Sequence, residues 1–383
     1  MRSVNCITVA APRLATNGNP TTSTSRYPFC ADQRRLAIAN TGTLRLFSKK
    51  GRISNAIPVW SQHHFEKILI PTMIDKILNY WNLRPIRLRN DISLAGSPER
   101  CATRVAVEDE RGAVLVLERL LPGQAQRRTA IARILDELAN NGLARSLRYI
   151  PDHSGVHVVH HRSDHYMLAP LIHGGPPPRP ALVRHGWRGR GMAEFLLEME
   201  AAASSVPENL VNELGAPLDL SAYVASLSET LRLRRPAEHT RLSTSLKRLA
   251  SFFDNWPCLP LRLSHGDFHP LNAVWSEDAL TGVIDWEFMG RKPMLYDVAN
   301  CVGCVGSEGP DALAADFVNG LIGTLNKAGW DLALLPETVA ALRTGWLSEW
   351  LRRGDEDMID LELAYMDLLT RNLDRLRIAW GAC

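Results

Sequence analysis

The pattern of apolar and polar residues divides the chain into an early part with the periodicity of strands and a later part with the periodicity of helices. Short alternating or apolar runs predict strands at residues 86–95, 102–108, 113–121 and, ending this part, within 156–171. Apolar residues that recur three and four positions apart predict a helix over residues 126–141. A short amphipathic helix is predicted before the strands, because Ile70, Ile74, Ile77 and Trp81 recur at helical spacing.

The later part is predicted to be mainly helical. Its apolar stripes predict helices at residues 191–203, 221–233, 238–253, 298–305, 311–328, 336–350 and 358–380. Within it, residues 259–264 alternate like a strand, and residues 273–275 and 282–284 predict a short hairpin with its turn near Ser276. Strands first and helices afterwards predict an α+β fold.

The first 60 residues differ from both parts. They hold nine Lys or Arg and a single acidic residue, Asp32, and no period persists in them. Three interpretations fit: a disordered extension, an organelle transit peptide, or a start assigned too early, since the next Met after Met1 is Met73. The expected division is residues 1–62 as a disordered or targeting extension, residues 63–172 as a first lobe and residues 173–383 as a second lobe.

Composition and charge narrow the class of protein. The chain has 383 residues, of which 45% are hydrophobic and 22% are charged, as in an ordinary globular protein. A net charge of +3 predicts no general affinity for nucleic acid, and no apolar run approaches the 18 residues of a membrane helix. Seven scattered cysteines form no disulfide pattern, so a cytoplasmic location is expected, or an organelle if the extension is a transit peptide. None of these features predicts an oligomeric state.

The most informative chemistry lies in two short segments. Residues 263–272 read LSHGDFHPLN and residues 283–287 read VIDWE. Asp267, Asn272 at +5 and Asp285 at +18 supply a carboxylate, an amide and a second carboxylate. Phosphoryl transfer with Mg²⁺ requires such a set: one carboxylate orients the attacking hydroxyl or accepts its proton, and two oxygen ligands hold the metal on the nucleotide phosphates. The predicted hairpin brings Asn272 and Asp285 to the same end.

These segments resemble the aminoglycoside phosphotransferase, choline kinase and type II homoserine kinase superfamily, which has a protein-kinase-like fold. The resemblance implies two lobes: a small N-lobe with an antiparallel sheet and a helix (nucleotide-binding), and a larger, mainly helical C-lobe. It implies ATP and Mg²⁺ as cofactors, with Asp267 as the catalytic base and Asn272 and Asp285 as metal ligands. It also implies that His265 and Asp297 brace the catalytic loop.

The early part carries the candidate residues for the nucleotide. Gly96 and Ser97 lie in a small-residue turn between the first two strands, where backbone N–H groups can approach phosphates. The third strand lacks the lysine of the kinase pattern, so Arg119 is the candidate phosphate-contacting cation, with Arg100 in reserve; a solvated surface arginine is the alternative. Glu137 is expected to pair with the strand cation, or else to be a solvated helix acid.

Residues 166–174 resemble the hinge between the lobes of this superfamily. The backbone around Ala169 and Leu171 would hydrogen-bond the adenine edge there. Identity of the side chains matters little at such a hinge beyond apolar contact.

The acceptor is expected to be a small molecule with a hydroxyl group, of the amino-sugar, sugar, choline or homoserine kind. Trp286, Glu287 and Trp350 suit a cationic or sugar-like compound, through charge pairing and stacking; the alternative is that the tryptophans belong to the core. Fold alone does not select the acceptor. A second class of function stays open, a pseudokinase that binds nucleotide or a partner without turnover. The missing strand lysine favours it, and the intact set of Asp267, Asn272 and Asp285 opposes it.

Overall fold

The structure is a computed structural model that describes residues 71–94, 100–309 and 311–382. The predicted extension over residues 1–62 and the predicted phosphate-contacting pair Gly96 and Ser97 lie outside the described residues. Within the described ranges, no helix is both long enough and apolar enough to cross a membrane.

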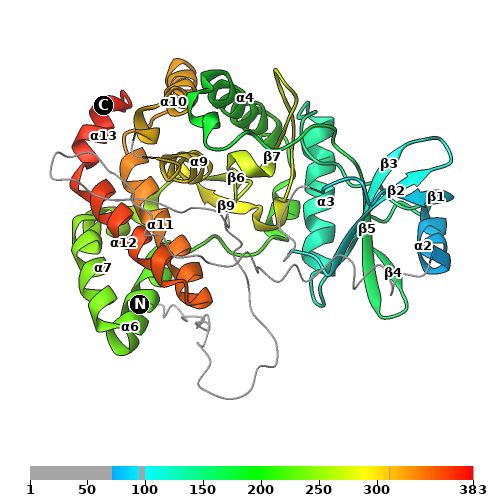
Figure 1. Cartoon of the computed structure of the whole chain (residues 1–383), viewed down its shortest axis with the longest axis horizontal. Helices are drawn as coiled ribbons and strands as arrows, with labels where there is room; N and C mark the ends of the chain where they lie inside the picture. Colours follow the sequence, from blue (N-terminus) through cyan, green and yellow to red (C-terminus); the bar gives the residue numbers. More distant parts are fainter. Residues whose placement is uncertain (1–70, 95–99, 310, 383) are drawn as a thin grey trace, which may run out of the picture.

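The first part of the described chain is built on a five-stranded antiparallel sheet with strand order β1-β2-β3-β5-β4 (Figure 1). Its elements are α2 (Pro71–Leu78), β1 (Pro85–Leu88), β2 (Thr103–Asp109), β3 (Val114–Arg119), α3 (Ala125–Asn140), β4 (Val159–His161) and β5 (Asp164–Pro170). The predicted strands over residues 102–108 and 113–121 and the predicted helix over residues 126–141 are therefore present. The strand predicted over residues 86–95 is shorter in the structure, because β1 ends at Leu88 and a turn follows it.

The two faces of this sheet are covered by different helices because side chains alternate along each strand. Tyr166 and Leu168 of β5 belong to a buried cluster with Ile74 and Ile77 of α2. Met167 and Ala169, one position out of phase with them, belong to the cluster that holds the apolar face of α3. The sheet is thus sandwiched between α2 and α3, and α3 lies on the side of the helical part (Figure 1).

The rest of the chain is mainly helical. Its helices are α4 (Gly186–Ala203), α5 (Glu208–Asn212), α6 (Leu220–Arg234), α7 (Pro236–Arg248), α8 (Ala250–Asn255), α9 (Tyr296–Gly306), α10 (Asp316–Lys327), α11 (Leu335–Arg353), α12 (Glu356–Arg371) and α13 (Leu373–Ala379). The small antiparallel sheet with its helix and the larger helical part confirm the predicted α+β, kinase-like arrangement (Figure 1).

Two predicted helices are each two helices in the structure. The stretch 238–253 divides into α7 and α8 at Leu249, and the stretch 358–380 divides into α12 and α13 at Asn372. The apolar stripe continues across each break, so periodicity alone does not reveal it. At Asn372 the side-chain amide donates to the carbonyl of Leu368 at 2.8 Å, a local bond of the kind that competes with helix continuation.

Four short strands in the helical part hold the two informative segments together. These are β6 (Leu261–Ser264), β7 (Ala273–Trp275), β8 (Leu280–Val283) and β9 (Gly290–Pro293). β6 pairs with β9 and β7 pairs with β8, both antiparallel. Residues 265–272 connect β6 to β7, and residues 284–289 connect β8 to β9. Because Ser264 pairs with Gly290 and Ala273 pairs with Val283, both connections lie at the same end of the two strand pairs.

Candidate active site

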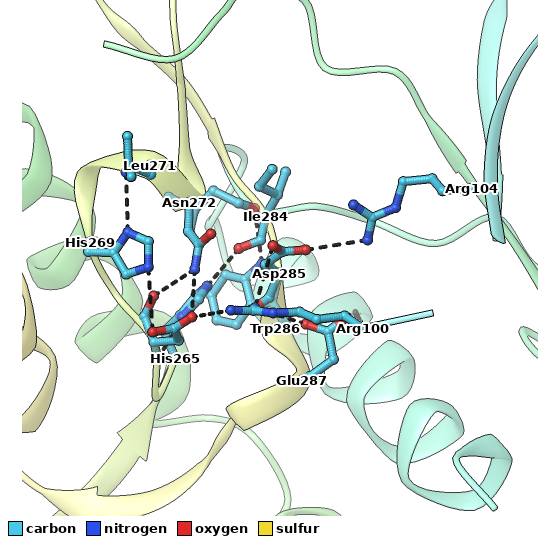
Figure 2. Close-up of polar contacts among 12 residues, drawn as sticks. Arg100, Arg104, His265, His269, Leu271, Asn272, Ile284, Asp285, Trp286 and Glu287 are labelled. Atoms are coloured by element: carbon cyan, nitrogen blue, oxygen red, sulfur yellow. Dashed lines mark hydrogen bonds and ion pairs between the residues drawn. The ribbon is translucent and has the colours of Figure 1, made fainter. Parts of the chain in front are cut away.

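The loop before β7 and the segment after β8 are joined by direct hydrogen bonds. The N–H of Ile284 donates to the carbonyl of Asn272 at 2.9 Å, and Nε2 of His265 lies 2.9 Å from the carbonyl of Ile284 (Figure 2). Asn272 and Asp285 therefore stand at the same end of the hairpin, as its predicted geometry requires.

Asp297, at the start of α9, holds the beginning of the loop. Its two carboxylate oxygens accept from the backbone N–H groups of His265 at 2.7 Å and Gly266 at 2.9 Å. Burial nevertheless raises the pKa of Asp297 to about 6, against the effect of these two donors. Gly266 adopts φ +84°, and a Cβ there would lie 2.1 Å from the carbonyl oxygen of Phe288, so only glycine fits this turn.

His265 is fully buried and links the two segments. Its Nδ1 accepts from the N–H of Asp267 at 3.2 Å, so the proton is on Nε2, which donates to Ile284. Burial lowers the pKa of His265 to about 4, and the ring packs on that of Trp286 with 4.4 Å between centroids. A neutral, fixed imidazole of this kind serves to hold the loop.

The Asp267 carboxylate is surrounded by donors. Asn272 Nδ2 donates to it at 3.0 Å, His269 Nε2 lies 3.5 Å away, and Arg100 forms a close ion pair with it (Figure 2). Asn300 of α9 adds a contact at 3.4 Å. Burial alone would raise the pKa of Asp267, but His269 and Arg100 outweigh it and hold the pKa well below its usual range. The group is therefore an ionised carboxylate that accepts hydrogen bonds.

Asp285 occupies the left-handed backbone region, with φ 66° and ψ 55°. Non-glycine residues in this region store strain, which gathers at functional sites. Its carboxylate lies 3.4 Å from Arg104 Nη2 and 3.5 Å from Arg100 Nη1. Asn272 uses its amide nitrogen on Asp267, which directs the amide oxygen elsewhere. One carboxylate and one amide oxygen, both hard ligands, fit a Mg²⁺ ion.

A network of buried charges connects these groups to the sheet and α3. Arg100 contacts Asp267, Asp285 and Glu287; Arg104 contacts Glu118 and Asp285; Arg128 contacts Glu118 and Glu287. Three guanidinium groups face four carboxylates in this set, which leaves a formal charge of −1. The surplus of negative charge favours a bound cation.

Three predicted site residues are not in this cluster, which corrects the expectations for them. Arg119 points to the opposite face of β3 and lies 3.7 Å from Asp164, because neighbouring strand residues alternate and Glu118 takes the inward position. Glu137 lies nine residues after Arg128 on α3, about 13 Å along the helix axis, and no described residue forms an ion pair with it. Trp350 is 2% exposed within a separate cluster, which α11 forms with α6, α7, α9 and α12.

Two further predicted acceptor residues are enclosed by protein contacts. Trp286 is fully buried and donates from its ring to the carbonyl of Val283 at 3.0 Å, so the core interpretation of the tryptophans applies to it. The carboxylate of Glu287 binds Arg128 and Arg100, and these arginines lower its pKa to about 2 although burial opposes them. Both residues brace the site.

The hinge residues lie on β5 and directly after it. Ala169 is buried and pairs with Val116 of β3. The N–H of Leu171 donates to the carbonyl of Val114 at 3.0 Å. The roles of their backbones toward adenine stay predictions.

Sequence reasoning missed Arg104, Glu118 and Arg128. The register of β2 and β3 places Arg104 directly opposite Glu118, so both project from the same face. A signal for this was present in the sequence. Leu115 and Leu117 are buried on the α2 face of β3, so Glu118, which is out of phase with them, projects from the α3 face.

A model of the phosphotransferase enzyme family matches residues 101–334 of the chain. Among curated proteins, a homoserine kinase of Bradyrhizobium sp. (strain ORS 278) is 32% identical over 135 residues, 34% of this chain and 39% of the relative. A homoserine kinase of Azorhizobium caulinodans is 28% identical over 206 residues, 53% of this chain and 56% of the relative. The chain thus spans less than two thirds of the length of these relatives.

Solved structures with the same fold include an amicoumacin kinase, hAmiN, in complex with AMP-PNP, Ca²⁺ and Ami. It has a TM-score of 0.57 and 12% identity, over 82% of this chain and 96% of that one. The GDP complex of aminoglycoside 2'-phosphotransferase-IIIa has a TM-score of 0.54 and 17% identity, over 82% and 99%. At these identities the likeness shows the fold.

Proposed function

Since the chain belongs to the phosphotransferase enzyme family, we propose that it transfers the γ-phosphoryl group of ATP to a hydroxyl group of a small molecule. The observation that carries this proposal is the convergence of Asp267, Asn272 and Asp285 on one end of the β7–β8 hairpin, held there by Asp297 and His265. A protein that only binds nucleotide has no need of an ionised carboxylate at Asp267. We therefore favour the active enzyme over the pseudokinase.

Asn272 and Asp285 would hold the metal ion, which we propose to be Mg²⁺. When bound, it neutralises charge on the nucleotide phosphates. Asp267 would orient the acceptor hydroxyl and take up its proton. In the structure Arg100 forms an ion pair with the Asp267 carboxylate. The acceptor hydroxyl would therefore reach this carboxylate only when the Arg100 side chain moves away.

We propose homoserine as the first acceptor to test, because the curated relatives carry that name. Solved structures with this fold are named for amicoumacin and aminoglycoside substrates, so amino-sugars come next. We further propose that the nucleotide lies between a lobe of residues 63–172 and a lobe of residues 173–383, with its adenine at Ala169 and Leu171. A cytoplasmic location fits such metabolites.

The proposal is tested by single-turnover transfer of labelled phosphate from Mg–ATP to each acceptor, using the parent and Asp267→Asn. An amide still accepts a hydrogen bond but cannot take a proton. The variant is therefore expected to keep its fold and its Mg–ATP affinity while transfer slows about 100-fold or more. Chelation of the metal should stop transfer in the parent. Transfer at the parental rate in Asp267→Asn would remove this residue as the base.

A further inference from the structure

The third strand of the sheet, β3, carries a buried acidic residue, whereas the corresponding strand of protein kinases carries a lysine. In kinases, a lysine on this strand contacts the phosphates and pairs with a glutamate on the following helix. Here Glu118 of β3 faces inward and forms a close ion pair with Arg128 of α3. The strand-to-helix ion pair is present with its charges exchanged. Because Glu118 repels phosphate, another residue must supply the positive charge for the nucleotide.

Among the residues that the structure describes, three arginines lie near enough to Asp285 or Glu118 to be considered. Arg128 is 2% exposed, and its guanidinium binds Glu118, Glu287 and the hydroxyl of Tyr149. It is enclosed between the sheet and α3, so it braces the network.

Arg100 lies on the acceptor side of the site. Its guanidinium contacts the Asp267 carboxylate, and its Nη1 donates to the Asp285 carbonyl at 3.0 Å and to Glu287 at 3.2 Å. A cation on Asp267 stands where the attacking hydroxyl has to be, which is distinct from the place of the phosphates nearer the adenine.

Arg104 has the position that the missing lysine would need. It projects from β2 directly opposite Glu118, with 2.9 Å between Nε and the carboxylate, and its Nη2 lies 3.4 Å from Asp285. Figure 2 shows Arg104 reaching Asp285 from the sheet, while Asn272 lies on the other side of Asp285 in this view. Its side chain is 13% exposed, against 2% for Arg128 and 5% for Arg100.

We propose that Arg104 on β2 is the phosphate-contacting cation of the nucleotide site, positioned by Glu118, and that it replaces the strand lysine. This inference rests on the proposed function. Glu118 pairs with Arg104 as the helix glutamate pairs with lysine in kinases, and Arg128 in turn neutralises Glu118 from α3. A planar guanidinium can hold Glu118 with one edge and a phosphate oxygen with another.

Calorimetric titration of the full chain with Mg–ADP, Mg–AMP-PNP and adenosine tests this without relying on turnover. Arg104→Met is expected to bind both phosphorylated ligands about 10- to 100-fold more weakly, the loss expected for one charge-assisted hydrogen bond, and adenosine with the parental affinity. Arg104→Lys should recover part of the loss. The matched control is Arg87→Met, which removes an arginine from β1 that pairs with Glu108 at the sheet surface; all three affinities should stay parental.

Removal of Arg104 leaves Glu118 with less positive charge around it, so thermal unfolding without ligand is measured for every variant. The double variant Arg104→Met with Glu118→Gln removes both charges and should show the same loss for the phosphorylated ligands. Parental affinity for Mg–ADP in either folded variant overturns the inference and leaves the proposed function intact. Equal weakening of adenosine also overturns it, since Arg104 would then act through structure alone. A parent that binds none of the three ligands overturns the inference together with the proposed function.

Discussion

His265 makes the stability of the protein depend on pH in a direction fixed by its burial. Its pKa falls to about 4 in the folded chain from an ordinary 6.5. Between these values the unfolded chain binds the proton and the folded one does not, so the contribution of His265 to stability falls as pH decreases from 6.5 to 4. The slope is at most about 1.4 kcal/mol per pH unit. Asp297 acts in the opposite sense between 3.8 and about 6, because its folded pKa is raised.

We predict that the His265→Gln variant lacks the contribution of His265 to the pH dependence of stability. The glutamine amide would replace Nε2 as the donor to the carbonyl of Ile284. The free energy of unfolding of parent and variant is measured by urea titration at several pH values from 4.5 to 7.5. All other titrating groups are shared, so the difference between the two curves should shrink as pH falls below 6.5. Parallel curves across this range would contradict the protonation state assigned to His265.

The residues of the loop could be predicted from sequence, whereas the cations could not. Asp267, Asn272 and Asp285 lie within 18 residues of one another, and a hairpin fixes their relation locally. The choice of Arg104 over Arg119 depends on which face of β3 turns toward the site. Because side chains alternate along a strand, a shift of one position would exchange the two faces. Arg128 and Glu287 are 159 residues apart in sequence, so nothing local indicates that they meet.

At the scale of elements, α4 and α10 pack closely through glycines. A Cβ on Gly320 of α10 would lie 2.3 Å from the carbonyl oxygen of Gly186 on α4, and one on Gly189 would lie 1.9 Å from that of Phe317. These contacts lie in the first turns of α4, which starts at Gly186 and not at residue 191 as predicted. The glycines in these first turns interrupt the apolar periodicity, so the pattern does not predict a helix there. The same glycines allow α4 to pack closely against α10.

Gly320→Ala and Gly323→Ala form a matched pair on α10 with opposite expected outcomes. The first forces a methyl group against backbone and should destabilise the protein by about 1–3 kcal/mol. The second meets no atom within 4 Å and should stabilise it by up to about 1 kcal/mol through helix propensity. Chemical denaturation measures both. Stabilisation by both substitutions would show that helix propensity, and not the contact with α4, governs position 320.

At the scale of the whole molecule, the buried charge network crosses from the sheet and α3 to the loops of the helical part. Apolar periodicity predicted the strands of the first part and the helices of the second, because these elements bury apolar stripes. It carried no information on the buried arginines and carboxylates that lie beside the apolar contacts at the junction of the two parts. Both members of each ion pair in this network are charged residues of ordinary strands, helices and loops. An analysis of apolar periodicity assigns such residues to the surface.

This junction predicts that Arg128→Met is far more damaging than its size suggests. Without the guanidinium, Glu118 and Glu287 stay buried with one partner fewer each, and loss of one member of a buried ion pair costs about 3–5 kcal/mol. Because Glu287 belongs to the helical part and Glu118 to the sheet, the loss should also weaken their coupling. We expect scanning calorimetry to show a lower Tm and separation of one transition into two.

Arg133→Met is the matched control on the same helix. Arg133 pairs with Glu213 at 2.9 Å, but the two side chains are 48% and 40% exposed, so its removal should cost no more than about 1 kcal/mol and leave the shape of the transition unchanged. Burial is then the variable that separates the two substitutions, since both exchange an arginine of α3 for methionine. If the two variants unfolded alike, the arginine network would be a set of contacts without consequence for how the sheet and the helical part are held together.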